Sequence, residues 1–261
     1  MTEKITTEVR GHVLCIGFNR PAKYNALDID MYRQLADAYG RLHSDNDLRC
    51  GLLFAHGDHF SGGLDLSEWA PEFAAGRLPE IAADAIEPFG QDLDRRLAKP
   101  MVVATQGICF TVGIELMLAA DIRVAADNTR LGQIEVKRGI YPVCGATVRF
   151  IQNIGWGNAM RYLLTGDEIP TDEALRMGLV QEVTPAGEQF DRAFEIAERI
   201  AKQAPLGVQA TLNNARMSLD EGERAAMQRL LPDLMPIMKS EDAEEGVNSF
   251  VERREARFQG R

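Results

Sequence analysis

The sequence predicts an α/β fold, in which short buried strands alternate with glycine-bearing loops and helices before a C-terminal region of helices. One observation is a repeated order of features: a buried strand, a loop with glycine and a helix follow one another at residues 50–66 and again at 99–120. The other is a change of character after Pro142, beyond which helical patterns predominate. We therefore expect a β/α core with the active site over residues 1–190 and a helical region over residues 191–261.

The N-terminal part is expected to form a hairpin, a helix and a strand. Residues 5–9 and 13–19 alternate around a turn, as the two strands of a β-hairpin do. Asp28 is a suitable N-cap for a helix that continues to about His43, and residues 50–57 form a short apolar strand. Apolar side chains recur on one face of that helix: Met31, Leu35, Ala38 and Leu42.

Residues 67–94 are rich in Ala and Pro and follow no regular period. Their large apolar side chains, Trp69, Phe73, Ile81 and Phe89, are irregularly spaced. Such a segment predicts a mobile apolar lid or the wall of a pocket.

The remaining strands and helices follow from apolar runs and their breaks. Strands are expected at residues 99–107, 122–126, 129–136 and 179–183. Helices are expected at residues 145–155, 156–166 and 171–178, and at 189–258 with breaks near Pro205 and Pro232.

The composition restricts the class of protein and its partners. The chain has 261 residues, of which 45% are hydrophobic, enough for one large domain or a core with an appendage. Its net charge of −10 argues against nucleic acid or an anionic membrane as a partner. With neither a signal-like N-terminus nor a membrane-spanning apolar run, a cytoplasmic location is expected. The cysteines are scattered without a CxxC pair, and we expect reduced core thiols at Cys15, Cys50, Cys109 and Cys144.

Glu115 is the most unusual residue in the sequence. It lies in "FTVGIELMLAAD", residues 110–121, whose apolar character predicts a helix buried on every face. A buried ionised carboxylate costs several kcal/mol unless it is paired or functional. Because no cation lies nearby in the sequence, a chemical role is the better explanation.

Two glycine-bearing loops could supply backbone donors beside this helix. Leu64 follows Gly62-Gly63, and Val112 begins the helix that carries Glu115. Two free N–H groups at one point stabilise a developing oxyanion. Each loop alone is weak evidence, since strand-to-helix turns often need glycine for structural reasons.

Glu135, in "GQIEVKRG", is a second candidate carboxylate, because it follows an apolar strand. Two carboxyl groups near an oxyanion hole can divide the roles of general acid and general base. An ion pair with Lys137 or Arg138 on a surface turn is an equally good explanation from these residues alone.

Other motifs are absent or incomplete. His56 and His59 form an HxxH pattern without a third ligand at suitable spacing, so no metal site is expected. The sequence has no P-loop, no GxSxG and no GxGxxG in the right context, which argues against an NTPase, an elbow-type serine hydrolase and a dinucleotide enzyme.

Several motifs together, in order and at matching spacing, resemble the crotonase superfamily and specifically its enoyl-CoA hydratases. They are "NRPAKYNAL", "FSGGLDL", "QGICFTVGIELMLAADIRVA", "LGQIEVKRGIYPVCGATVRF", "LLTGDEIPTDEALRMGLVQEV" and "EGVNSFVERREARF". The resemblance covers nearly the whole chain.

The resemblance implies a spiral of β-β-α units with a C-terminal helical trimerisation region, assembled as a homotrimer or a dimer of trimers. It implies an acyl-CoA thioester as substrate, with no metal or other cofactor. Leu64 and Val112 match the two oxyanion donors. Glu115 matches the carboxylate that activates water for attack at C3, and Glu135 matches the one that exchanges the proton at C2.

The resemblance also implies where coenzyme A binds. Backbone around Ala22, Tyr24 and Ser61 matches the adenine pocket. Phe250 and Arg253 match residues that reach the adenine and 3′-phosphate of coenzyme A bound to a neighbouring subunit. Without the resemblance, the cationic tail would be interpreted as a solvated face of a terminal helix.

Three positions depart from the pattern of the family. A run of glycines is replaced by Thr111-Val112-Gly113, a proline by Ile134, and a glycine near the catalytic water by Val143. A valine keeps its N–H, but its branched side chain narrows the space around it.

The sequence therefore predicts an enoyl-CoA hydratase that adds water across the 2,3 double bond. Alternatives on the same scaffold are an isomerase, a hydrolase or a decarboxylase, since a fold does not fix the reaction. A further alternative is a trimer that binds acyl-CoA without turning it over, its water site closed by Val112 and Val143.

Overall fold

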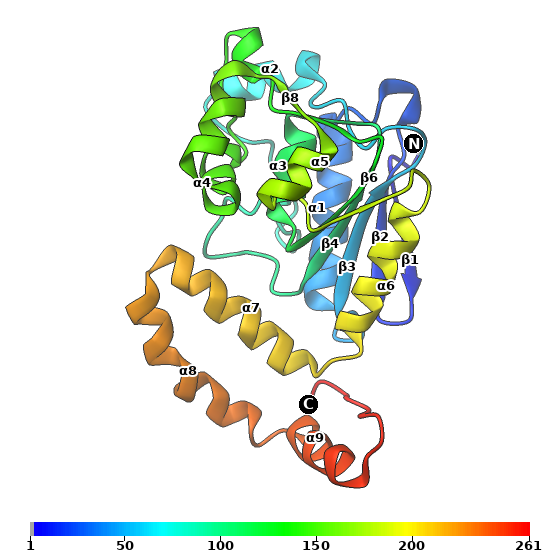
Figure 1. Cartoon of the computed structure of the whole chain (residues 1–261), viewed down its shortest axis with the longest axis vertical. Coiled ribbons are helices and arrows are strands. Elements are labelled where there is room, and N and C mark those ends of the chain that lie inside the picture. The colour runs from blue at the N-terminus through cyan, green and yellow to red at the C-terminus, as the bar shows by residue number, and fades with distance from the viewer. Residues whose placement is uncertain (1–2) are drawn as a thin grey trace.

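The computed structural model describes residues 3–261, which form a layered α/β core with helices that project from one end (Figure 1). A six-stranded sheet has the order β1-β2-β3-β4-β6-β9, and all its pairs are parallel except β1 with β2. Its strands are β1 (Ile5–Arg10), β2 (Val13–Phe18), β3 (Cys50–Ala55), β4 (Met101–Thr105), β6 (Ile122–Ala126) and β9 (Glu182–Thr184). The predicted α/β class and N-terminal hairpin are confirmed.

A second, three-stranded sheet carries the candidate site. It has the order β5-β7-β8, from β5 (Ile108–Phe110), β7 (Arg130–Gly132) and β8 (Glu168–Ile169). The first sheet supplies β4, which runs directly into β5 and then into α3 (Val112–Ala119). This order places the start of α3 at the edge of the smaller sheet.

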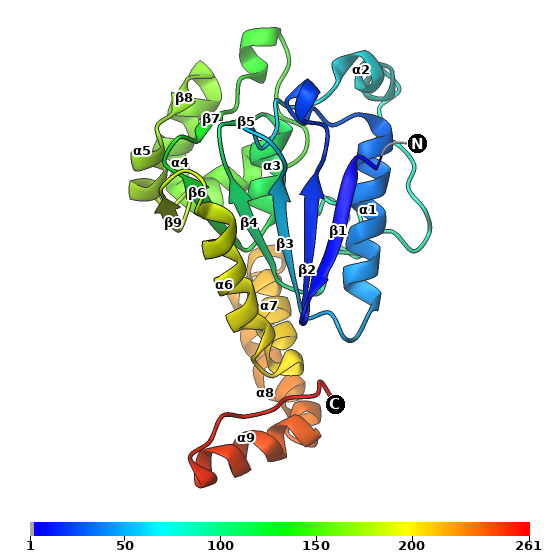
Figure 2. The same ribbon diagram turned by 90° about the vertical axis from the view of Figure 1, so that its right-hand side faces the viewer.

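Helices cover both faces of the large sheet (Figure 2). On one face lies α1 (Ile29–Ser44), whose N-cap Asp28 accepts a hydrogen bond from the Met31 N–H at 2.8 Å. On the other face lies α6 (Gln189–Ala201), whose alanines pack against β2, β3, β4 and β6. The division predicted at residue 190 stays a prediction, but α6 packs with the core, so the projecting helices begin after it.

The segment after β3 forms part of the core. It contains α2 (Leu66–Ala74) and then a long stretch without regular structure up to β4. Trp69 and Phe89 are fully buried, and the Trp69 Nε1–H donates to the Leu27 carbonyl at 2.7 Å. Of the two predicted descriptions, a packed wall fits these side chains better than an open lid.

The helices after β7 follow the predicted pattern. The two helices expected at residues 145–155 and 156–166 together make up α4 (Ala146–Thr165), which is interrupted at Gly155 by a non-helical φ of 75°. The short helices are η1 (Pro21–Lys23), η2 (Glu135–Arg138) and α5 (Thr171–Met177).

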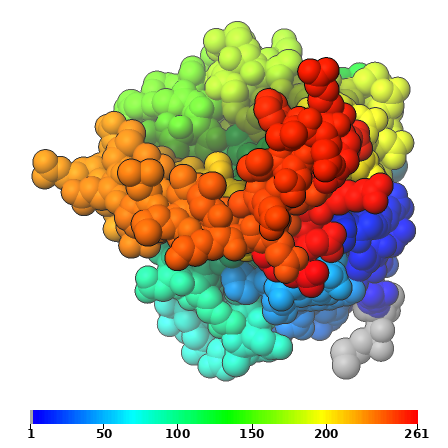
Figure 3. Space-filling model, turned by 90° about the horizontal axis from the view of Figure 1, so that it is seen from below, coloured from blue at the N-terminus to red at the C-terminus, as the bar shows by residue number. Residues whose placement is uncertain are grey.

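The C-terminal helices project from the core as a hairpin followed by a terminal helix (Figure 1). Seen from that end, these orange and red helices lie in front of the core (Figure 3). They are α7 (Pro205–Asp220), α8 (Glu223–Ile237) and α9 (Glu241–Glu252). Pro205 is the first residue of α7, where a proline is well accommodated. The break expected near Pro232 is wrong, because α8 continues through Pro232 and Pro236, and the chain turns instead at Gly222, with φ 92°.

Among residues 3–261, no helix is both long enough and apolar enough to cross a lipid bilayer.

Asp28 links the N-terminus of α1 to two cations, and its loss should destabilise the fold. Its side chain is 2% exposed and lies 2.8 Å from Lys4 Nζ and 3.3 Å from Arg20 Nε. We expect Asp28→Ala to lower the free energy of unfolding by roughly 2–4 kcal/mol, because a cap and a buried ion pair are lost together. Denaturant unfolding measures this.

The matched control is Asp30→Ala. Asp30 lies 3.1 Å from the same Lys4 Nζ, but its side chain is 43% exposed. Asp30→Ala should lower the free energy of unfolding by less than about 1 kcal/mol. Equal effects of the two substitutions would contradict this account of Asp28.

Candidate active site

Two loops, one after β3 and one after β5, lie side by side and form the floor of the site. The Ser61 N–H donates to the Ile108 carbonyl at 2.9 Å, and the Phe110 N–H donates to the Ser61 carbonyl at 3.0 Å. A Cβ on Gly113 would lie 3.1 Å from Ser61 Cβ, so only a glycine fits comfortably there. The close approach brings the start of α3 next to residues 61–64.

Both predicted oxyanion donors have unused N–H groups. Leu64 lies between the Gly63 N–H, which donates to Ser61 Oγ, and the Asp65 N–H, which donates to the Leu27 carbonyl. Val112 is the first residue of α3, where a helix leaves the N–H without an internal partner. Within the described part of the chain, neither N–H has an acceptor.

The turn that orients Val112 is strained. Thr111 has φ 50° and ψ −116°, a conformation that side-chain-bearing residues rarely adopt. Such a residue costs on the order of 1–3 kcal/mol and persists where its surroundings enforce it. Here the neighbour is Gly63, with φ 110°, on which a Cβ would overlap Thr111 Oγ1.

Glu115 lies on α3, one turn from this loop, and its carboxylate is held by backbone donors. The side chain is 2% exposed. Its Oε1 accepts from the Cys144 N–H at 2.8 Å and from the Ala146 N–H at 3.0 Å. Ala146 is the first residue of α4, so the carboxylate caps the positive end of that helix.

Opposing effects place the pKa of Glu115 near neutral pH. Burial raises its pKa to about 7, and the negative charge of Glu135 also raises it. The two backbone hydrogen bonds and the charge of Arg149 lower the pKa. A carboxyl poised near 7 can accept or release a proton at physiological pH.

Glu135 is buried but is less well satisfied. It begins η2, since β7 ends at Gly132, four residues before residue 136, where the sequence pattern places the end of the strand. Its Oε1 accepts from Gln133 Nε2 at 2.8 Å, whereas its Oε2 is buried without a partner in the described chain. Burial raises its pKa as well.

The alternative explanation of Glu135 as a surface ion pair is wrong. Glu135 is 8% exposed and forms no salt bridge with any described residue. Lys137 Nζ instead lies 3.5 Å from Asp167 Oδ1. The negative charge of Glu135 raises the pKa of Glu115, so the two buried carboxyl groups are coupled electrostatically.

Sequence reasoning missed two residues that support the site. Asn25 is fully buried, and its Nδ2 donates to the carbonyls of His56 at 3.0 Å and His59 at 2.7 Å, which fixes the loop after β3. Gln133 positions Glu135, as described above. A polar residue beside the glutamate in "GQIEV" was the available signal for Gln133, whereas Asn25 lies in a turn where Asn is common.

The histidines of the HxxH pattern have structural roles. The His59 Nδ1 accepts from the Ile108 N–H at 3.1 Å, and the His56 Nε2 lies 2.8 Å from Thr6 Oγ1. No cluster of possible metal ligands occurs among residues 3–261.

The residues expected at the adenine pocket surround one loop. Tyr24 is 55% exposed and stacks on His59 with ring centroids 5.0 Å apart, and Ala22 is exposed in η1. The Ser61 backbone is fully paired within the chain, and the Ser61 hydroxyl donates to the Asn25 carbonyl at 3.0 Å. Ser61 therefore shapes the loop, while Tyr24 offers an accessible flat surface.

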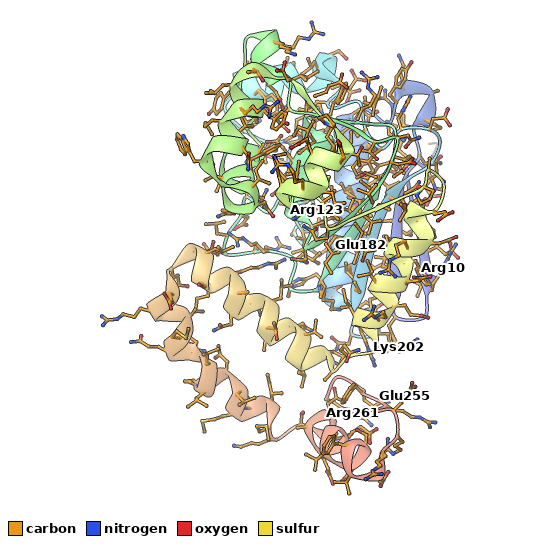
Figure 4. The ribbon with its side chains drawn as sticks, viewed as in Figure 1. Arg10, Arg123, Glu182, Lys202, Glu255 and Arg261 are labelled. Atoms are coloured by element: carbon orange, nitrogen blue, oxygen red, sulfur yellow. The ribbon has the colours of Figure 1, made fainter. Side chains whose placement is uncertain are left out.

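Phe250 and Arg253 lie on and just after α9, at the opposite end of the molecule from this loop (Figure 1). Phe250 is 85% exposed. Figure 4 shows Glu255 and Arg261 in the same distant region, where Arg261 pairs with Glu241 at 2.9 Å. These residues do not reach the site of their own chain.

Comparison with known proteins identifies the family. The enoyl-CoA hydratase/isomerase family matches residues 8–261. The chain belongs to this family. A probable enoyl-CoA hydratase/isomerase from Mycobacterium abscessus has a similar structure, with a TM-score of 0.96, 48% sequence identity and full coverage of both chains.

Two named relatives are hydratases. The chain is 35% identical over 259 residues to enoyl-CoA hydratase EchA19 of Mycobacterium tuberculosis, covering 97% of this chain and 96% of the relative. It is 29% identical over 265 residues to the 2,3-dehydroadipyl-CoA hydratase of Escherichia coli, with full coverage of both. The predicted family and crotonase-type fold are thus confirmed.

The burial of Glu115 should cost stability above neutral pH. Its pKa of about 7 in the folded chain exceeds the ordinary 4.5, so the folded state binds the proton more tightly and stability falls as pH rises between these values. The free energy of unfolding of Glu115→Gln, relative to that of wild type, should therefore be roughly 2 kcal/mol higher at about pH 8 than at about pH 5. Denaturant unfolding at both pH values tests this.

The exposed Glu188 provides the control substitution, Glu188→Gln. If the difference between Glu115→Gln and wild type does not change with pH, Glu115 does not carry the buried charge inferred here.

Proposed function

We propose that the protein is an enoyl-CoA hydratase that adds water across the 2,3 double bond of a 2-enoyl-CoA thioester. The observation that carries this proposal is the pair of buried carboxyl groups, Glu115 and Glu135, one held by two N–H groups and the other with an unpaired oxygen. Two free backbone donors lie on the adjoining loops. Such a set can polarise a carbonyl, activate water and supply a proton.

The Leu64 and Val112 N–H groups would bind the thioester carbonyl oxygen. As water adds at C3, negative charge moves onto that oxygen and forms an enolate. Donors fixed in advance by the backbone stabilise this charge without reorganisation, an effect commonly worth about 3–4 kcal/mol per donor.

The two carboxyl groups would divide the proton transfers. Hydrogen bonds from the Cys144 and Ala146 N–H groups favour the charged form of Glu115, and Gln133 gives Glu135 one donor while Glu135 Oε2 has none. In its charged form, Glu115 takes a proton from water as the water oxygen bonds to C3. Glu135 gives its proton to C2, and one proton then passes from Glu115 back to Glu135 through solvent.

The choice among crotonase reactions rests on the number of proton-transfer groups. Moving a double bond needs one proton shuttle, whereas hydration needs a base for water and an acid for C2.

Val143, which replaces a glycine near the water site of the family, is 39% exposed and does not fill a buried space. This favours an open water site over a chain that only binds the thioester.

An acyl-CoA substrate follows from the hydratase relatives. Ala22, Tyr24 and Ser61 would border the adenine pocket, with the exposed ring of Tyr24 as a stacking surface. Phe250 and Arg253 would complete this pocket only from a neighbouring subunit, because they lie far from it in their own chain (Figure 1).

We also propose that the projecting helices form the interface of a homotrimer, or of a dimer of trimers, in the cytoplasm. Large apolar side chains are exposed along α7, α8 and α9 and in the turn after α8: Leu219, Met227, Leu230, Leu231, Leu234, Met235, Met238, Val247, Phe250 and Val251. Exposed apolar surface of this extent is typical of an interface. A groove of about 600 Å³ lies between α7 and the core, lined by Ile200, Val208, Leu212 and Phe258 among others.

Hydration removes the ultraviolet absorbance of the conjugated thioester, which gives a direct assay. We expect purified protein to bleach crotonyl-CoA or a longer or aromatic 2-enoyl-CoA. Glu115→Gln and Glu135→Gln should each lower kcat by at least about 100-fold, since each removes a proton-transfer group. If only one substitution abolishes turnover, a two-carboxylate hydratase is the wrong assignment.

The N–H of Val112 can be removed almost alone. Proline is tolerated as the first residue of a helix, but its Cδ would meet the Cβ of Thr111, whose ψ is −116°. The substitutions at Val112 are therefore made in a Thr111→Gly background, where Val112→Pro should fold while losing one oxyanion donor. We expect kcat to fall about 100- to 1000-fold. Val112→Ala keeps the N–H and should change kcat only a few-fold; a folded Val112→Pro with comparable kcat would exclude this donor.

A further inference from the structure

Arg149 connects the catalytic loop to a distant part of the chain. It lies in the first turn of α4, next to the donors that hold Glu115. Its Nη1 donates to the Cys144 carbonyl at 3.3 Å, and its Nη2 donates to the Gly90 carbonyl at 3.1 Å. Gly90 belongs to the irregular segment between α2 and β4, so one guanidinium fastens that wall to the loop before α4.

The contact with Gly145 shows how closely the guanidinium fits. Gly145 has φ 109°, and a Cβ built on it would overlap Arg149 Nη1. The guanidinium therefore lies against the backbone of Gly145. On one side, the Cys144 carbonyl accepts from Arg149; on the other, the flanking N–H groups of Cys144 and Ala146 reach Glu115.

Gln91 strengthens the same connection, because its Nε2 donates to the Val143 carbonyl. Gln91 thus holds the Val143 carbonyl directly, while Arg149 bridges the carbonyls of Gly90 and Cys144. Without such restraints, a loop that contains Gly139 and Gly145 would have considerable freedom.

Arg149 also has an electrostatic effect. It is partly buried and forms no salt bridge with a described residue, although its positive charge lowers the pKa of Glu115. The other titratable groups around Glu115 are Glu135 on η2 and the Cys144 thiol before α4. Glu87 and Arg96, from the irregular segment, lie near Arg149 itself.

We propose that Arg149 is a positioning residue for the proposed hydration: its guanidinium holds the Cys144 carbonyl so that the N–H groups of Cys144 and Ala146 point at Glu115 and hold its carboxylate for proton removal from water. Arg149 contacts no reacting atom in this role. It acts through Glu115 alone.

The test measures the protonation of Glu115 with and without Arg149. Infrared difference spectra against matched Glu115→Gln proteins report the C=O band of the protonated carboxyl, so this measurement needs no substrate. The midpoint should lie near pH 7 in wild type and about one unit higher in Arg149→Met, because an opposite charge is lost. Arg149→Lys keeps the positive charge, so its midpoint should return most of the way to that of wild type.

Kinetics provide the second measurement. The kcat/KM of Arg149→Met should fall about tenfold more at about pH 6 than at about pH 9, with KM little changed, since only the ionised fraction of Glu115 is altered. Arg161→Met, on the exposed face of the same helix, is the control and should match wild type. If Arg149→Met does not fold, Arg149→Gln removes the charge while keeping N–H donors.

Two results would overturn the proposal: an unchanged infrared midpoint in a folded Arg149 variant, or a loss of kcat/KM by one factor at every pH. A wild-type protein that does not hydrate any 2-enoyl-CoA would contradict the proposed function instead. In that case the infrared midpoint would still report whether Arg149 acts on Glu115.

Discussion

The site depends on one interaction, the capture of the Glu115 carboxylate by the N-terminus of α4. Burying this carboxylate is unfavourable in itself, and the N–H groups of Cys144 and Ala146 offset part of the cost. The interaction joins α3 to α4 across the loop that follows η2. Glu135 is the first residue of η2, at the start of that connection. The interaction therefore also fixes where Glu135 lies relative to Glu115.

The same region contains a second costly feature, the backbone of Thr111. A glycine at this position would adopt φ 50° and ψ −116° without strain. In this chain the turn is enforced by hydrogen bonds on both sides of it, from the Thr111 N–H to the Gly132 carbonyl and from the Ile114 N–H to the Thr111 carbonyl. Strain and buried charge thus meet where two free N–H groups are held, as expected of a site selected for activity over stability.

The sequence predicted what depends on local pattern. The strand, glycine loop and helix units, the Asp28 cap and the anomaly of Glu115 all follow from neighbouring residues. Contacts between distant segments could not be predicted in this way. The strand before Glu135 is shorter than its apolar pattern suggests, because β7 pairs only as far as β5 extends, with Phe110 opposite Gly132.

Arg149 and Pro232 illustrate the same limit. The partner of Arg149 is the Gly90 carbonyl, 59 residues away, and no local pattern indicates it. Pro232 was expected to end a helix, since proline removes a backbone hydrogen bond. In α8 only Ala226 is buried, so the carbonyls that the prolines leave unpaired can be solvated and the helix continues.

We propose that Glu135 exchanges the proton at C2 while Glu115 activates water. Isotope exchange can separate these two roles. A saturated thioester such as butyryl-CoA cannot be hydrated, but in deuterated water its C2 protons exchange if an enolate forms. We expect Glu135→Gln to lose this exchange by about 100-fold or more, and Glu115→Gln to keep it within about tenfold of wild type. Exchange that survives in Glu135→Gln but is lost in Glu115→Gln would contradict the assignment of both carboxyl groups.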